Sequence, residues 1–339
     1  MSADVRRTNA RARARLSAEV RRILGGLGYE EVETPCLVPA PGMEPHLHPF
    51  RADFVPEGGG AATPLWLHTS PEYAMKRLLA EGFPRIFQLA RVFRNGEVSA
   101  THNPEFTMLE LYRAGTDYDG IMRDLEELVA HCARELTGGT RVRAGGRDLE
   151  LAAPFERLTV AGAFLASAGV DLGACDGDAT KLRAALLARG LDAGRSGDGF
   201  DDLFFRVFLD RVEPSLGQGR PAYLVDWPAR MAALSRLKAS DRRFAERFEL
   251  YAGGLELANG FSELTDAGEQ RRRLEEERAH RIHLGRPAYP LDERFLSALP
   301  RMPDAGGVAL GLDRLLMLLV GALSIEEVLL FPARELLGG

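Results

Sequence analysis

The sequence FRNGEVSATHNPEFTMLELY, residues 93–112, is typical of two strands joined by a loop, yet it carries more charged and polar side chains than a hairpin needs in order to fold. Alternation along the second strand places four side chains on one face of the sheet: Phe106, Met108, Glu110 and Tyr112. Glu110 is unexpected there, because a buried carboxylate costs free energy unless it is paired. A wet sheet edge or an arginine partner would explain Glu110 alone, but the full set of polar residues indicates a ligand site.

A second acidic hairpin is expected in FELYAGGLELANGFSEL, residues 248–264. The Gly253-Gly254 pair fits a two-residue turn, which pairs Tyr251 with Glu256 and Glu249 with Ala258. Glu249 and Glu256 are then diagonal neighbours, roughly 7–8 Å apart at the backbone, and oxygen ligands at that spacing suit magnesium. Two exposed strand glutamates are the alternative. This register leaves Asn259, Phe261 and Glu263 on the opposite face from Glu256, unless the strand bends or bulges at Asn259-Gly260.

The third stretch with unusual chemistry is GVALGLDRLLMLL, residues 307–319, in which a Gly-rich strand leads into an apolar helix. Arg314 is a cation just inside that helix. It either pairs with Asp313 or another acid, or serves as a fork for phosphate oxygens. The glycines permit a ligand to approach the backbone closely, but they match neither a dinucleotide fingerprint nor a P-loop.

The remaining segments surround these three stretches. Residues 8–27 predict a helix ended by Gly28, residues 29–39 a strand, and residues 39–60 a loop region. Residues 65–79 run from a strand into a helix, with Ser70 as N-cap and Pro71 at the first helical position. Another helix is expected after residue 116, with a capping box of Thr116 and Asp119. Residues 137–241 mix helices with loops, and residues 269–285 predict a charged, solvated helix. No repeat or linker divides the chain, so we expect one domain over residues 1–339.

Composition limits the classes of protein. The chain has 339 residues, 45% of them hydrophobic, and a formal net charge of -6, which argues against a nucleic-acid surface without excluding a local basic patch. Its three cysteines have neither disulfide nor metal-ligand spacing, which indicates a reducing, cytoplasmic compartment. The longest apolar run, residues 315–323, is too short to span a bilayer, and the N-terminus lacks the apolar segment of a signal peptide.

Taken together, these stretches resemble a family. Residues 93–112 resemble motif 2 of class II aminoacyl-tRNA synthetases in their lysyl form, GVALGLDR resembles motif 3, and the first helix with GYEEVETP resembles motif 1. The resemblance covers nearly the whole chain and is strongest to the truncated lysyl-tRNA synthetase paralogues that join (R)-beta-lysine to a lysine of elongation factor P. At three places the residues present are those typical of the paralogues: Ser70, Ala309 and the sequence ELANG. Leu111 is instead the residue typical of the lysyl-tRNA synthetases.

The resemblance implies an α+β fold, with an antiparallel β-sheet flanked by helices, and no anticodon-binding domain. Residues 137–241 would be a helical insertion between motif 2 and the acidic hairpin. The implied enzyme is an AMP-forming amino acid–protein ligase, a cytoplasmic homodimer that uses ATP and Mg²⁺, with tRNA disfavoured as a partner. Its alternatives are a minimal lysyl-type enzyme that charges tRNA and a non-catalytic paralogue.

The resemblance also assigns roles to individual residues. Arg94 and Arg314 would be catalytic, and Glu249 and Glu256 would bind the metal. The implied ATP site comprises Arg94, Asn95, Gly96, His102, Asn103, Phe106, Glu249, Leu250, Gly311 and Arg314. The implied amino-acid site comprises Ser70, Pro71, Glu72, Glu110, Tyr112, Glu256, Asn259, Phe261, Glu263 and Ala309. One departure from the family is Gly96, which stands where a glutamate usually helps to seat ATP; Glu97 follows it and is expected to replace that glutamate in part.

Overall fold

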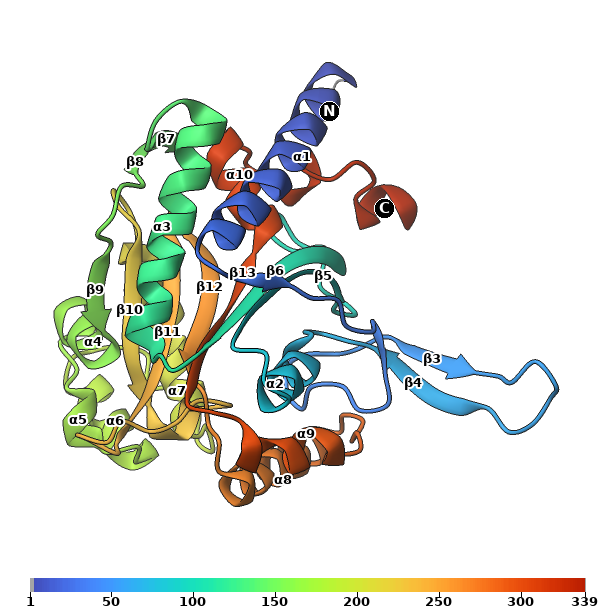
Figure 1. Cartoon of the computed structure of the whole chain (residues 1–339). Coiled ribbons are helices and arrows are strands. Elements are labelled where there is room, and N and C mark those ends of the chain that lie inside the picture. The colour runs from blue at the N-terminus through green and yellow to red at the C-terminus, as the bar shows by residue number, and fades with distance from the viewer. Residues whose placement is uncertain (1–2, 339) are drawn as a thin grey trace.

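The computed structural model describes residues 3–338, and an eight-stranded sheet forms its centre (Figure 1). The strand order is β1-β5-β6-β13-β12-β11-β10-β9. The strands span Glu30–Glu31 (β1), Arg85–Phe93 (β5), Glu105–Ala114 (β6), Glu156–Thr159 (β9), Ala222–Pro228 (β10), Phe244–Ala252 (β11), Leu255–Ser262 (β12) and Ala305–Gly311 (β13). The α+β class is confirmed. The inner strands are antiparallel, whereas β1 and β9 pair in parallel with β5 and β10. Both parallel pairs are joined by long connections that contain helices, as parallel pairing requires.

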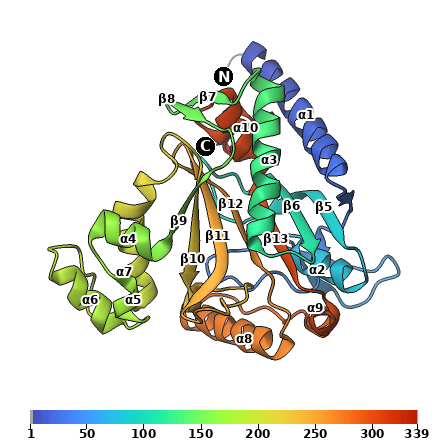
Figure 2. The same ribbon diagram turned by 60° about the vertical axis from the view of Figure 1, so that its left-hand side comes forward.

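Three helices cover one face of the sheet: α1 (Ala3–Gly26), α3 (Tyr118–Thr137) and α10 (Leu312–Val320), as Figure 2 shows. The alternation expected for residues 106–112 is confirmed, because Leu109 and Leu111 are fully buried against these helices. Leu310 of β13 and Leu250 of β11 join the same core. The hydrophobic core therefore occupies one face of the sheet, and the alternate side chains are left to form a site on the other.

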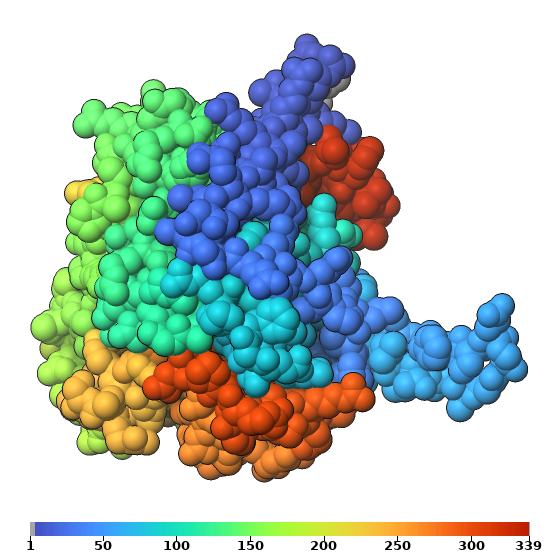
Figure 3. Space-filling view, in the orientation of Figure 1, coloured from blue at the N-terminus to red at the C-terminus, as the bar shows by residue number. Residues whose placement is uncertain are grey.

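The other face is bordered by α2 (Glu72–Ala80), α8 (Ala267–His283), α9 (Glu293–Ala298) and the loop of residues 39–50. A small sheet of β2 (Leu37–Val38), β3 (Arg51–Phe54) and β4 (Thr63–Leu67) adjoins this face, and its β3–β4 hairpin projects from the body of the molecule (Figure 3). The expectation of a loop throughout residues 39–60 is wrong at β3. That strand exists because β4 pairs with it, a contact that local composition does not reveal.

Residues 137–241 contain more than helices. The elements are β7 (Arg141–Ala144), β8 (Arg147–Glu150), β9, α4 (Val160–Ala168), α5 (Leu172–Cys175), α6 (Ala179–Leu187), α7 (Phe200–Val207) and β10. Phe164, Phe204 and Phe208 form the centre of a separate hydrophobic cluster under these helices. Because β9 and β10 belong to the main sheet, the region is built onto the central fold and is not a detached appendage.

Several helix ends differ from expectation. Asp117, and not Thr116, caps α3 by accepting a hydrogen bond from the Gly120 amide at 3.0 Å. The helix α2 begins at Glu72, one residue after Pro71, and the Ser70 hydroxyl accepts the Glu72 amide. A short helix, α11 (Ala333–Leu336), lies near the C-terminus. Within the described residues no helix is both long and apolar enough to cross a membrane.

Candidate active site

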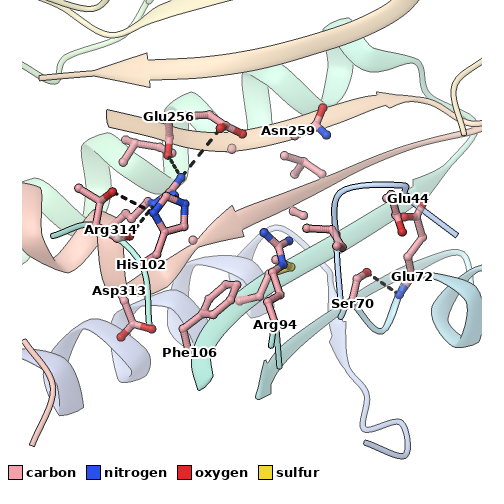
Figure 4. A pocket seen from close by; sticks show the side chains of 18 of the residues that line it. Glu44, Ser70, Glu72, Arg94, His102, Phe106, Glu256, Asn259, Asp313 and Arg314 are labelled. Carbon is pink, nitrogen blue, oxygen red and sulfur yellow. Dashed lines mark hydrogen bonds and ion pairs between the residues drawn. The ribbon is translucent and has the colours of Figure 1, made fainter. Parts of the chain in front are cut away.

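A pocket lies on the sheet face opposite the core (Figure 4). Strands β6, β12 and β13, the starts of α2 and α10, and the loops that carry Glu44, Ser70 and His102 contribute to its walls. It brings together most of the residues singled out in the sequence: Ser70, Glu72, Arg94, His102, Asn103, Phe106, Tyr112, Glu256, Asn259, Phe261, Ala309, Gly311 and Arg314. Side chains that are far apart in the chain therefore meet in one cavity: Arg314, His102 and Glu256 lie towards one end, Glu44, Glu72 and Ser70 lie towards the other, and Arg94 lies between them.

A β-bulge in β12 sets the floor of this pocket. Tyr251 lies opposite Glu256 as expected, but Leu250 lies opposite Ala258 and Glu249 opposite Asn259. The expected pairing of Glu249 with Ala258 is wrong, because Leu257 is an extra residue in β12. A bend was expected at Asn259-Gly260, and the bulge lies just before it. Like that bend, the bulge brings Glu256 to the same face of the strand as Asn259 and Phe261. Glu256 now lines the same pocket as Asn259 and Phe261.

Arg94 follows β5 and lies over the ring of Phe106, with the guanidinium carbon 5.1 Å from the ring centroid. Its Nε is buried and has no hydrogen-bond partner among the described residues. Glu97 Oε2 lies 4.0 Å from Arg94 Nη1, but Glu97, Asn95 and Gly96 do not line the pocket. Arg94 thus brings a guanidinium group to the pocket lining, which suits an anionic ligand.

Arg314 is held by three neighbours at the start of α10. It donates to the Thr101 carbonyl at 3.3 Å, to the Glu256 carbonyl at 2.8 Å and to His102 Nε2 at 2.6 Å. The alternative pairing with Asp313 does not occur, because the Asp313 carboxylate binds Arg13 and accepts the Thr107 amide. Arg314 therefore faces the pocket as a cation without a tightly bound carboxylate partner; Glu256 Oε2 is 3.9 Å away.

His102 is neutral in this arrangement. Burial, with Arg314 and then Arg94 nearby, lowers the pKa of His102 to about 4. Its Nε2 accepts from Arg314, so the proton belongs on Nδ1, which lies 2.9 Å from the Ser99 hydroxyl. His102 accordingly orients Arg314.

The opposite end of the pocket is acidic. Glu110, fully buried, accepts hydrogen bonds from the Ser70 hydroxyl at 2.6 Å and the Tyr112 hydroxyl at 2.7 Å. Burial, and next the charge of Glu72, raise the pKa of Glu110 to about 8. Glu110 lies behind Ser70 and Tyr112, which themselves line the cavity. A cation that enters this end would meet hydroxyls backed by a carboxylate.

Lys76 is a buried charged residue beside the site that the sequence interpretation did not single out. Its ammonium is buried, lies 2.5 Å from carboxylate oxygens of both Glu72 and Glu263, and sits 4.9 Å from the Phe261 ring centroid. Burial alone would lower the pKa of Lys76, but the charges of Glu263 and Glu72 outweigh burial and raise that pKa. The i,i+4 spacing of Glu72 and Lys76 on α2 was the available signal. Glu263 is occupied by this pairing and does not line the pocket, contrary to the expectation that it binds substrate directly.

Other expected site residues lie outside the pocket lining. Glu249 accepts hydrogen bonds from Arg247 and Tyr251, both at 2.5 Å, and the side chain of Leu250 is buried in the core on the opposite face. Pro71 does not line the cavity either. Asn103 does, but its amide group donates to the Glu105 carbonyl and accepts the Ala333 amide, so it fixes the loop to the C-terminal segment.

The pocket also contains residues to which the sequence analysis assigned no ligand-binding role. These are Glu44, Leu47, Thr101, Met108, Leu257, Ala258, Gly307, Val308, Asp313 and Ile325. Gly307 shows why such positions matter, since a Cβ atom there would collide with the Tyr112 ring and the Glu263 carboxylate. Leu111, which differs from the residue typical of the paralogues, does not line the pocket, because its side chain is buried in the core on the other face of the sheet.

The donor set fits a divalent cation that takes most of its ligands from a bound nucleotide. No group of three or more His, Cys, Asp or Glu side chains arranged to hold a metal occurs within residues 3–338. Burial, opposed by Arg247 and reinforced by Glu256, raises the pKa of Glu249 to about 7. Two carboxylates that repel each other in this way are stabilised by a shared cation. Glu256 lines the pocket, whereas Glu249 lies outside its lining and both of its carboxylate oxygens accept hydrogen bonds within the protein. Carboxylate oxygens are ligands of the kind magnesium prefers.

Two comparisons of the sequence with known proteins each cover nearly the whole chain. The chain matches the family described as tRNA synthetases class II (D, K and N) over residues 1–335. It is 42% identical, over 327 residues, to the elongation factor P–(R)-beta-lysine ligase of Salmonella typhi, and the alignment covers 95% of this chain and 94% of that protein. Both matches therefore include the sheet, the pocket and the loops that border it.

Proposed function

The chain belongs to the class II tRNA synthetase family, and from this premise we propose that it is an ATP-dependent ligase that activates (R)-beta-lysine and transfers it to a lysine side chain of elongation factor P. The observation that carries the proposal is a single pocket with Arg314, His102 and Glu256 at one end, Glu44, Glu72 and Ser70 at the other, and Arg94 between them. A nucleotide triphosphate suits the first end, and an amino acid with two ammonium groups suits the second.

In the first reaction the beta-lysine carboxylate attacks the α-phosphorus of ATP, the bond to the bridging oxygen breaks, and pyrophosphate leaves. Arg94, which lines the pocket, would bind the α-phosphate and stabilise the charge that develops there. Phe106 offers its ring to the adenine, and Arg314, held by His102, would bind the outer phosphates. The residues act by position and charge, and no protein nucleophile is required.

Magnesium would be held by Glu256 and Glu249 together with the nucleotide. When bound, it supplies positive charge that neutralises the triphosphate. The residues of the chain prepare this arrangement, because Arg247 and Tyr251 hold the Glu249 carboxylate in place.

In the second reaction a lysine amine of elongation factor P attacks the carbonyl carbon of the adenylate. An amide bond forms, AMP leaves with the bonding electrons, and the amine loses one proton. The acidic end of the pocket holds the ammonium groups of the beta-lysyl moiety during this step, through Ser70, Glu72 and Tyr112.

The transfer is tested by the intact mass of elongation factor P after incubation with this protein, ATP, magnesium and beta-lysine. We expect a mass increase of one lysyl residue, and no increase when ATP is omitted. If elongation factor P stays unmodified and tRNA is charged under the same conditions, the proposal is wrong and the tRNA synthetase alternative holds.

The proposal includes a cytoplasmic homodimer with a single catalytic domain. Its cysteines Cys36, Cys132 and Cys175 are free, which agrees with a reducing compartment. Sedimentation equilibrium tests the dimer: a mass of one chain at micromolar concentration would contradict it.

A further inference from the structure

The buried stripe of α1 continues into two polar side chains. Leu16 and Val20 are fully buried, and the same helical spacing leads back to Arg13 and Asn9. Asn9 is buried and donates to the carbonyl of Glu327 at 2.8 Å. Only 20% of the Arg13 side chain is exposed. A cation on the buried face of an amphipathic helix requires a partner, and Arg13 has two.

Arg13 joins α1 to two segments that border the pocket. Its guanidinium forms an ion pair with the carboxylate of Asp313, at the start of α10, and donates to the carbonyl of Val328 at 3.0 Å. Val328 follows Ile325, which lines the pocket and whose amide donates to the Ala100 carbonyl at 2.7 Å. One side chain therefore connects α1 to α10 and to the segment that contacts the loop after β5.

The Asp313 carboxylate connects the two ends of the proposed ATP site. Strand β13 ends opposite Met108, so no residue of β13 lies opposite Thr107. The second carboxylate oxygen of Asp313 accepts the Thr107 amide at 2.6 Å and so takes the place of a strand partner. Thr107 follows Phe106, and Asp313 precedes Arg314. One buried carboxylate thus fixes the backbone beside the adenine platform to the backbone beside the arginine for the outer phosphates.

A carboxylate at this position needs a counter-charge. Asp313 is 1% exposed, and an ionised carboxylate is costly to bury without a cation. Arg314 does not provide that charge, because its donors are directed to His102 and to two carbonyls. Among residues 3–338, Arg13 is the one cation in ion-pair contact with Asp313. Without Arg13, the acceptor of the Thr107 amide would be an unpaired buried charge.

We propose that Arg13 is a positioning residue for ATP, which acts through Asp313 to set the separation of Phe106 and Arg314 that the nucleotide spans. This inference rests on the proposed function in that it places adenine at Phe106 and the outer phosphates at Arg314. Arg13 itself does not line the pocket. Its effect therefore falls on the affinity for ATP and leaves the amino-acid end unchanged.

Calorimetric binding of ATP in the presence of magnesium tests this role. Arg13→Met should raise the dissociation constant of ATP about tenfold, a typical coupling within one hydrogen-bonded network. The dissociation constant of beta-lysine should stay within about twofold, because its site is separate from this network. Arg13→Lys keeps the charge but not the forked geometry, so it should lose less affinity than Arg13→Met. Arg11→Met is the matched control: Arg11 is exposed on the same helix, and its loss should change neither constant.

A double-variant cycle separates action through Asp313 from a general loss of structure. Asp313→Asn keeps an oxygen for the Thr107 amide but removes the charge that Arg13 binds. If the two residues act as one pair, the double variant should bind ATP within about twofold of the weaker single variant. Losses that multiply to about a hundredfold would overturn the proposal. Partial unfolding would instead lower the number of binding sites per chain, which calorimetry measures separately from affinity.

This inference and the proposed function can fail separately, because ATP binding requires neither beta-lysine nor elongation factor P. Equal affinity of the wild type and Arg13→Met for ATP would overturn the positioning role and leave the ligase reaction standing. If elongation factor P stays unmodified while Arg13→Met weakens ATP binding, the ligase proposal is wrong and the positioning role stands. A wild-type protein that binds no ATP would overturn both.

Discussion

At the scale of single residues, the site depends on which charged groups are already satisfied by the protein. Arg94 lines the pocket, and Arg314 is oriented there by His102 and two carbonyls. Lys76 occupies Glu72 and Glu263. The charged groups that line the pocket mark the places where ATP and the amino acid are expected to bind.

Arg94→Ala tests the assignment of the α-phosphate. Loss of one donor to the transition state should reduce ATP–pyrophosphate exchange about 10²- to 10³-fold, equivalent to about 3–4 kcal/mol. Arg91→Ala, in the same hairpin, is the control. Arg91 is exposed, and its ion pair with Glu105 is long, at 4.0 Å. Exchange by Arg94→Ala within about threefold of wild type would remove this role.

Ala309→Gly tests the choice between beta-lysine and alpha-lysine. Ala309 lines the pocket between Glu110 and Asn259 of the neighbouring strands, and its methyl group fills space that glycine would leave open. One methyl group is worth about 1–3 kcal/mol of discrimination, or roughly 10- to 200-fold. We expect the variant to activate alpha-lysine better and so to narrow the ratio of kcat/KM values. An unchanged ratio would show that Ala309 does not select the substrate.

Sequence reasoning found the residues of the motifs but not those that long-range contacts bring to the pocket. Arg94, His102 and Phe106 occur in one hairpin, so their common site could be predicted from local pattern. Glu44 could not, because it is placed by Arg281, 237 positions away in the chain. The interpretation of the α8 segment as a solvated helix was correct for Arg272, which is exposed, and wrong for Arg281.

At the scale of elements, two features shape the site. The bulge at Leu257 turns Glu256 towards Asn259 and Phe261, and no residue type in the sequence marked that position. The end of α8 holds the loop of residues 39–50 through Arg281, which also contacts the Pro287 carbonyl and the Tyr289 hydroxyl. The expected hairpin register therefore gives the correct strands and the first two pairs after the turn, and it assigns the wrong partners beyond the bulge.

Arg281→Met tests the role of α8 in holding this loop. The substitution keeps an apolar stem but leaves the carbonyls of Glu44, Leu47 and Pro287 without this donor, each at a cost of about 1–3 kcal/mol, so the free energy of unfolding should fall by at least about 3 kcal/mol. The KM for beta-lysine should rise more than the KM for ATP, since the loop borders the amino-acid end. Arg272→Met on the exposed face of α8 should change stability by less than about 1 kcal/mol. Equal effects of the two substitutions on unfolding by urea would contradict this role.

At the scale of the whole molecule, the central sheet separates a dry core from an acidic site. The core lies against α1, α3 and α10, and the opposite face carries the pocket. This division was predictable from the alternation in β6, whereas the parallel edge strands β1 and β9 were not, because their pairing depends on where long connections return. Carboxylates concentrated on one face should make the stability of the free protein depend on pH.

The expected pH dependence follows from Glu110. In the unfolded chain this carboxyl releases its proton near pH 4.5, but in the folded protein its pKa is about 8. The folded state then binds more protons between these values, so stability should fall as pH rises from about 4.5 to 8. Glu110→Gln should flatten the decline of the melting temperature between about pH 5 and 8. A variant curve that parallels the wild-type curve would show that Glu110 is already ionised at neutral pH.

The central claim is that one pocket joins ATP to a diamino acid, and ATP–pyrophosphate exchange measures this most directly. Wild-type protein is supplied with magnesium, labelled pyrophosphate and either beta-lysine, alpha-lysine or no amino acid. We predict rapid exchange with beta-lysine, weaker exchange with alpha-lysine by at least about tenfold in kcat/KM, and none without an amino acid. Preference for alpha-lysine, or no exchange with either amino acid, would contradict the account.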